Sequence, residues 1–130
     1  MINYLKDILK NNGYREWEDA LNFENIPNSL LDKSYHLEIG QGRGQKIHEI
    51  LHNIRIRLFY KGYKNPASAT NLAYDEMEKL ATLIIAGRIS HAKIKNIVFN
   101  NYQIEKQDKT NDNNVMLMLD FDIVTMLNVI

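Results

Sequence analysis

The chain has 130 residues, no Cys, two Pro and six Gly, and 45% of its residues are hydrophobic, which predicts one domain over residues 1–130 and excludes disordered, collagenous and disulfide-stapled chains. Sixteen basic residues balance sixteen acidic ones, so no net charge draws the whole molecule to nucleic acid or to an acidic membrane. Charged residues interrupt the N-terminal region and the longest run of strong hydrophobes is Val115 to Leu119, so we expect a cytosol-like compartment with neither a signal peptide nor a membrane span.

The N-terminal third predicts a helix, an irregular connection and a short strand. Apolar residues at helical spacing indicate an amphipathic helix over residues 2–12: Ile2, Leu5, Ile8 and Leu9. Residues 14–34 keep no sustained period but are rich in large apolar side chains, so we expect an irregular connection with one turn of helix against the core. Apolar residues alternate with polar ones over residues 35–39, which predicts a strand with one buried face.

Residues 47–60 are open to two interpretations. Their first half fits a helix, whereas Ile54-Arg-Ile-Arg-Leu58 alternates strictly and contains β-branched residues. We therefore favour a strand over about residues 50–60, which follows a flexible tip at Gly40–Gln45.

The segment that follows predicts a long helix. Asn65 before Pro66 is a typical helix start, because the Asn side chain can cap free amides and Pro tolerates the first helical position. An apolar stripe then continues as far as Gly87. The stripe consists of Ala69, Leu72, Ala73, Met77, Leu80, Ala81 and Ile84.

Two strands close the sequence. The first, over residues 98–104, changes its inward phase at Asn100-Asn101, as a β-bulge would cause. A polar tip at residues 106–114 leads to the last strand, over residues 115–123. The order α-β-β-α-β-β predicts an α+β fold, a single domain with a mainly antiparallel sheet of about four strands packed against two helices. We expect the apolar face of the strand over residues 50–60 to pack against the long helix.

His48-Glu-Ile-Leu-His52 matches the H-E-x-x-H motif of zinc metallopeptidases. On a helix the two imidazoles would lie about 6 Å apart along one face, with Glu49 as the general base. On a strand the same separation is roughly 13 Å, which is too far for two ligands of one ion. Because we favour a strand, a small zinc metallopeptidase is the alternative interpretation. Its third ligand would come from Glu76, Glu78 or His91.

The glycine and charge patterns indicate assembly more than nucleotide or nucleic-acid binding. Gly40, Gly42 and Gly44 follow a strand, but a dinucleotide-binding turn needs Gly at position 45, where this chain has Gln. Residues 43–64 hold six basic residues and one acidic one, and residues 16–38 hold six acidic residues and one basic one. We favour complementary faces, within a subunit or between neighbours, over a DNA surface, and ordinary solvated faces are the remaining alternative.

The last strand carries a second apolar set, which consists of Met116, Met118, Val124, Met126 and Ile130. Methionine suits an adaptable contact with another subunit, and a partly covered second sheet face is the alternative. The sequence shows no Ser-His-Asp or Cys-His arrangement, so we predict no catalytic, cofactor-binding or metal-binding residues and no enzymatic activity. Single residues without a partner in register are interpreted as structural: Trp17, His36 and His91.

Several features of the sequence occur together in one family. An initial helix is followed by an acidic, aromatic connection with Ile26-Pro27 and by the alternating strand Ile54-Arg-Ile-Arg-Leu-Phe-Tyr60. A helix then starts at Asn65-Pro66, and two long strands close the chain. Over nearly all 130 residues this pattern resembles the tail terminator proteins of long-tailed phages, together with related tail-completion, neck and minor capsid proteins of the same size.

The resemblance implies a structural virion protein of the tail or neck, made and assembled in the host cytoplasm. Such a subunit forms a homo-oligomeric ring, a hexamer, that caps the finished tail tube and joins it to the head connector. The implied partners are the tail tube protein and the head connector or neck protein, with DNA only passing through the lumen and with no membrane contact. The family performs no catalysis, and its members do not use the H-E-x-x-H motif.

Overall fold

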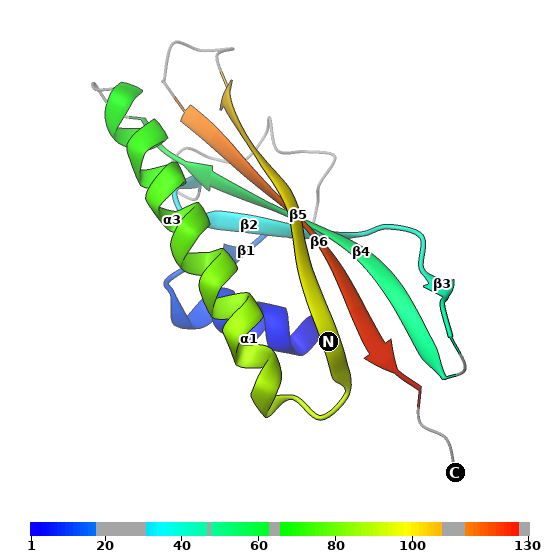
Figure 1. Cartoon of the computed structure of the whole chain (residues 1–130). Helices are drawn as coiled ribbons and strands as arrows, with labels where there is room; N and C mark the ends of the chain where they lie inside the picture. Colours follow the sequence, from blue (N-terminus) through cyan, green and yellow to red (C-terminus); the bar gives the residue numbers. More distant parts are fainter. Residues whose placement is uncertain (18–30, 47, 63–65, 108–113, 128–130) are drawn as a thin grey trace.

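A β-sheet forms the centre of the fold, and the computed structural model describes residues 1–17, 31–46, 48–62, 66–107 and 114–127 (Figure 1). The strands follow the order β1-β2-β4-β6-β5, and β3 pairs with β4 outside this path. Their bounds are β1 Arg15–Glu16, β2 Ser34–Ile39, β3 Arg43–Gly44, β4 Glu49–Tyr60, β5 Ile94–Gln107 and β6 Asn114–Met126. The pairing of β1 with β2 is parallel and every other pairing is antiparallel, so the sheet is mixed but mostly antiparallel.

The long pairing of β4 with β6 gives the sheet two different faces. Ile54 lies opposite Phe121, and Ile56 lies opposite Leu119, and all four side chains are fully buried. The intervening pair places Arg55 opposite Asp120 on the other face. Alternation of apolar and polar residues on both strands therefore directs one face to the core and leaves charged groups on the second.

Two α-helices of the described chain, α1 (Ile2–Asn11) and α3 (Pro66–Gly87), pack on the apolar face. In Figure 1, α3 runs along β5 and β6, and α1 lies beside its C-terminal half. The predicted stripe of α3 is buried at every position except Leu72, which is 41% exposed. Ile54, Ile56 and Leu58 share one buried cluster with this stripe, which confirms that the apolar face of β4 packs under the long helix.

The β-bulge predicted at Asn100-Asn101 is confirmed. Phe99 pairs with Phe121 and Asn101 pairs with Asp120, so Asn100 is the extra residue of β5. A second irregularity lies between Ile94 and Asn96. The bulge keeps apolar residues of β5 on the core face on both sides of the extra residue.

The predicted α+β class and the order of the main elements are confirmed, but the expectation of about four strands is wrong. The sheet has six strands, because β1 and β3 are two-residue strands that lack an alternating pattern. The segment 14–34 is partly a strand at Arg15–Glu16, and its predicted helical turn falls outside the described residues. The tip at Gly40–Gln45 contains β3, and most of the tip at 106–114 also lies outside the described residues.

A core substitution tests this arrangement. Leu119 is fully buried at the centre of β6, so we expect Leu119→Ala to lower the free energy of unfolding by about 2–5 kcal/mol through lost burial and a cavity. Urea denaturation measures the change. The matched control is Leu72→Ala on the exposed side of α3, which should change stability by less than about 0.5 kcal/mol. Equal effects of the two substitutions would contradict the assignment of the core face.

Candidate functional site

The face of the sheet opposite α1 and α3, called here the outer face, combines a fixed polar network with apolar side chains. Alternation along β4 and β6 places Arg55, Arg57, Met118, Asp120 and Asp122 on this face. Neither described α-helix contributes to the burial of these residues. Its residues on β4 and β6 range from buried Asp120 to exposed Arg55, so a partner could reach part of this face.

Asp120 is the centre of the polar network. Its side chain is only 9% exposed, and its Oδ1 accepts hydrogen bonds of 2.9 Å from both Asn53 Nδ2 and Asn100 Nδ2. Arg55 Nε donates to Asp120 Oδ2 at 3.2 Å. Burial alone would raise the pKa of Asp120, but the hydrogen bonds from Asn100, Asn53 and Arg55 outweigh it and lower the pKa. The carboxylate is thus held ionised in one orientation.

The bulge of β5 places two asparagines opposite this carboxylate. Asn101 is the residue paired with Asp120, and Asn100, the extra residue that follows core-facing Phe99, donates to its Oδ1. Asn53 Nδ2 also donates to Asp122 Oδ1 at 3.0 Å, which joins the second acidic residue to the network. The sequence patterns did not predict this network. The predicted bulge and the pairing of the last two strands would together have placed Asn100 near Asp120.

The complementary charges predicted between residues 16–38 and 43–64 meet within one subunit at Glu38 and Arg57. These two side chains form a hydrogen-bonded ion pair across β2 and β4, and the hydrogen bond from Arg57 lowers the pKa of Glu38. Arg55 is engaged by Asp120, which lies outside the acidic segment. The sequence left open whether these charges meet within one subunit or between neighbouring subunits, and for Arg57 the contact is within the subunit.

The apolar part of the outer face is covered at one end and exposed at the other. Met116 and Trp17 pack against Phe59 and Leu31 in a small cluster separate from the main core. At the opposite end, Met126 is 39% exposed, and Val98 on β5 is 48% exposed. The second sheet face is therefore partly covered, and its exposed apolar residues lie beside the Asp120 network.

The H-E-x-x-H residues do not form a helical zinc site, because His48 lies in a turn and the remaining four residues belong to β4, which begins at Glu49. His48 has a backbone φ of 69° in the turn before β4. Glu49 is 5% exposed and forms an ion pair with Lys95. His52 Nε2 lies 2.9 Å from Thr125 Oγ1 on the core side of the sheet, and burial lowers its pKa. The structure therefore separates the three groups that a peptidase would need together.

The possible third ligands lie on other elements. Glu76 is 6% exposed and lies 3.6 Å from Lys33 Nζ, near the buried hydrogen bond of 2.6 Å between Tyr14 and Tyr60. Glu78 is exposed on α3, and His91 packs edge-on against Tyr4. Over the described ranges, no group of three or more His, Asp or Glu side chains could hold a metal ion.

The remaining single residues have local contacts. His36 Nδ1 lies 3.0 Å from the carbonyl oxygen of Trp17, which ties β2 to the end of β1. A Cβ at Gly40 would lie 3.3 Å from the backbone oxygen of Asn53, so this glycine permits close packing of the chain on β4. These contacts give structural roles to residues that the sequence pattern left without partners.

No protein-family model matches the chain, and a search of curated proteins finds no similar sequence. In the part of the chain that the structure describes, no helix has both the length and the apolar character needed to cross a bilayer.

The pKa of Asp120 gives a pH-dependent prediction. Because this pKa is lower in the folded chain than its unfolded value of about 3.9, its stabilising contribution is complete above that value and is lost as pH falls through the folded pKa. We expect Asp120→Asn to lower the free energy of unfolding by about 1–3 kcal/mol at neutral pH. The deficit relative to wild type should shrink when urea denaturation is repeated in strong acid.

The control for this measurement is Asp7→Asn, since Asp7 is exposed on α1. This variant should lose much less stability at neutral pH. A deficit of Asp120→Asn that stays constant across the acid range would contradict a role for the ionised carboxylate.

The extended conformation of the motif predicts that zinc does not stabilise the fold. We expect EDTA to leave the melting temperature unchanged and elemental analysis to find less than one zinc per chain. Added zinc should shift the melting temperatures of wild type and of His48→Gln equally. One tightly bound zinc per chain, or a peptidase activity that Glu49→Gln abolishes, would instead support the metallopeptidase alternative.

Proposed function

We propose that this protein is a structural virion protein, a phage tail terminator or a related neck protein. In this proposal six copies form a ring that caps the tail tube and joins it to the head connector. DNA passes through the lumen, and the protein makes no membrane contact and performs no catalysis. It resides in the tail or neck of the virion after assembly in the host cytoplasm.

The observation that carries the proposal is the composition of the outer face. Its polar groups satisfy one another around Asp120, so the face is already ordered before any partner arrives. Exposed Val98 lies opposite Asp122 of this network, and exposed Met126 lies farther along β6 on the same face. A preordered polar patch with exposed apolar side chains is typical of a protein-binding surface, and it costs little entropy to bury.

The difference between the two edge strands of the sheet also supports a ring. One end of the strand order is the long β5, whereas the other end is the two-residue β1, with β3 as an additional short strand on β4. Unlike edges favour a head-to-tail contact in which different surfaces of two subunits meet. Such a contact closes into a ring when the rotation between subunits permits it.

Ring formation and tail capping can be measured separately. The chain has a mass of 15.2 kDa, and we expect light scattering after size-exclusion chromatography to give six times this value, with ring-shaped particles in electron micrographs. In phage particles that lack this protein, added wild type should restore the joining of heads to tails. Met126→Asp should form the ring but fail in joining, because a charge would have to be buried against the partner.

Leu72→Asp is the matched control, since Leu72 is exposed to a similar degree, 41%, but lies on α3 away from the outer face. It should leave both measurements near wild type. A wild-type chain that stays monomeric at every concentration and does not restore joining would contradict the proposed function.

A further inference from the structure

The strand β5 leaves a long edge of the sheet open. Within the described residues β5 pairs only with β6, and it extends over 14 residues from Ile94 to Gln107. Open edges of this length present backbone N–H and C=O groups that can pair with another strand. Two irregularities, between Ile94 and Asn96 and at Asn100, interrupt the first half of this edge, whereas Asn101 to Gln107 pairs with β6 in regular register and could accept a further strand on its other side.

An apolar groove with a volume of about 560 Å³ lies beside this edge, between α3 and β5. Phe99 is its only lining residue from the sheet, so the groove follows the open side of β5 rather than the sheet interior. Its α3 wall includes Ala81, Thr82 and Ile85. Near the groove, Tyr74 and Tyr102 pack edge to face at 6.2 Å, and they are 45% and 43% exposed. We call this feature the β5 groove.

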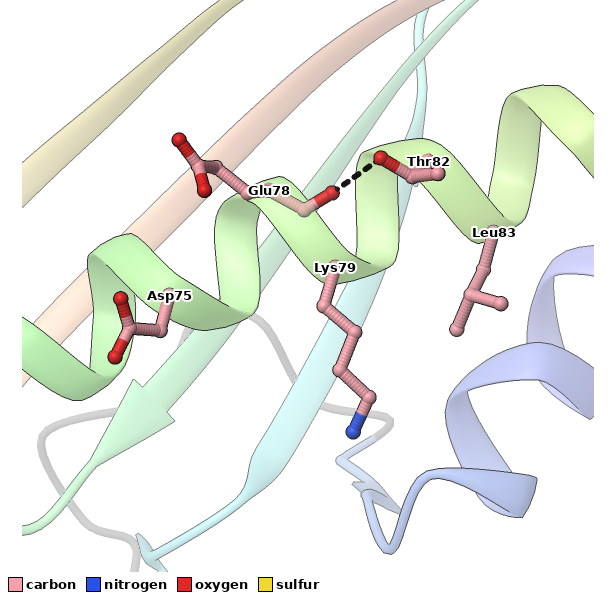
Figure 2. Close-up of a pocket in the computed structure, with 5 residues that line it drawn as sticks. All are labelled: Asp75, Glu78, Lys79, Thr82 and Leu83. Atoms are coloured by element: carbon pink, nitrogen blue, oxygen red, sulfur yellow. Dashed lines mark hydrogen bonds between the residues drawn. The ribbon is translucent and has the colours of Figure 1, made fainter.

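The rim of the β5 groove is acidic. Glu78 lines both the groove and a second, shallower depression of about 440 Å³ on α3, which also includes Asp75 (Figure 2). Figure 2 shows Glu78 and Thr82 on one side of the helix and Lys79 and Leu83 on the other. In the described structure neither Asp75 nor Glu78 forms a salt bridge, and the charge of Glu78 raises the pKa of neighbouring Tyr74. Lys79 lines the same depression, but its Nζ lies 3.7 Å from Glu76 Oε2, so the charges of Asp75 and Glu78 have no salt-bridge partner among the described residues.

The opposite edge of the sheet carries unneutralised positive charge. Residues 43–46, called here the β3 arm, include Arg43 and Lys46, both of which are exposed and outside every salt bridge among the described residues. A Cβ at Gly44 would meet nothing within 4 Å, so the face of the arm at Gly44 has room for a larger side chain. Among the described strands β3 pairs only with β4, which leaves its other edge for a further strand.

We propose that the β3 arm of one subunit pairs with the open edge of β5 in the next subunit of the ring. Arg43 and Lys46 then lie against the acidic rim at Asp75 and Glu78. The contact rests on the proposed ring function and supplies its subunit interface. Pairing of two β5 edges with each other would close a two-fold dimer instead, and it would bring two acidic rims together, which is electrostatically unfavourable.

Disulfide cross-linking tests the contact directly, because the chain contains no Cys and every disulfide must come from introduced residues. We expect the double variant Gly44→Cys with Thr82→Cys to form, on oxidation, a ladder of covalent oligomers up to the size of the ring. An equal mixture of the two single variants should stop at dimers. The control Gly44→Cys with Lys10→Cys, on the exposed side of α1, should form no ladder.

Charge reversal provides an independent test, in which reversing the charges on both surfaces should restore the contact that either reversal alone disrupts. Asp75→Lys with Glu78→Lys should abolish the ring at concentrations where wild type is assembled, and so should Arg43→Glu with Lys46→Glu. Combining all four substitutions restores opposite charges and should restore the ring, which a merely unfolded variant could not do.

Each outcome decides between the proposals. An assembled ring without cross-links and without rescue would overturn the β3–β5 contact while leaving the ring function intact. Dimers from Thr82→Cys alone would show that the β5 edges meet each other, which also overturns it. A wild-type protein that never assembles would overturn both the contact and the proposed function.

Discussion

The pairing of β4 with β6 is the constraint on which the rest of the structure depends. It extends over twelve residue pairs, from Glu49 opposite Met126 to Tyr60 opposite Val115. Because side chains alternate between faces, a slip of one residue would place Arg55 in the core and Ile56 in solvent. The buried pairs that α3 covers are incompatible with that slip, so burial fixes the register, and the register in turn fixes the outer face.

The same register determines the chemistry of the outer face. Arg55 opposite Asp120 is a direct consequence of Ile54 opposite Phe121, and the bulge at Asn100 then adds a further donor to the carboxylate. A carboxylate this buried would be costly without partners, and three donors from two neighbouring strands offset the cost. Packing of the core face therefore fixes the strand register, and the register in turn fixes the positions of the polar side chains on the outer face.

Local patterns in the sequence were sufficient to predict the main helices and strands. The alternation of Ile54-Arg-Ile-Arg-Leu58 predicted β4, and the phase change at Asn100-Asn101 predicted the bulge, because both signals lie within a few residues of one another. Two-residue strands such as β3 depend on a distant partner and leave no period to detect. The start of β5 was missed for a related reason, since the irregularity between Ile94 and Asn96 breaks the alternation there.

The motif at His48 shows why conformation must be known before chemistry is assigned. The same five residues would approach a single ion on a helix, but on β4 they place Glu49 against Lys95 and His52 against Thr125. The charge segments had a similar ambiguity, because a sequence cannot distinguish contacts within a subunit from contacts between subunits. The structure pairs Arg57 with Glu38 within the subunit, whereas Arg43 and Lys46 are exposed and outside the salt bridges of the described residues.

The central claim is that the open edges of the sheet are completed by neighbouring copies. Hydrogen–deuterium exchange of the assembled ring and of the dissociated subunit tests it most directly, since added backbone pairing slows the exchange of the amides involved. We expect assembly to slow exchange in β5 and in residues 43–46, while the central pairs of β4 and β6 stay protected in both states. An assembled ring in which β5 exchanges as fast as in the free subunit would contradict the account.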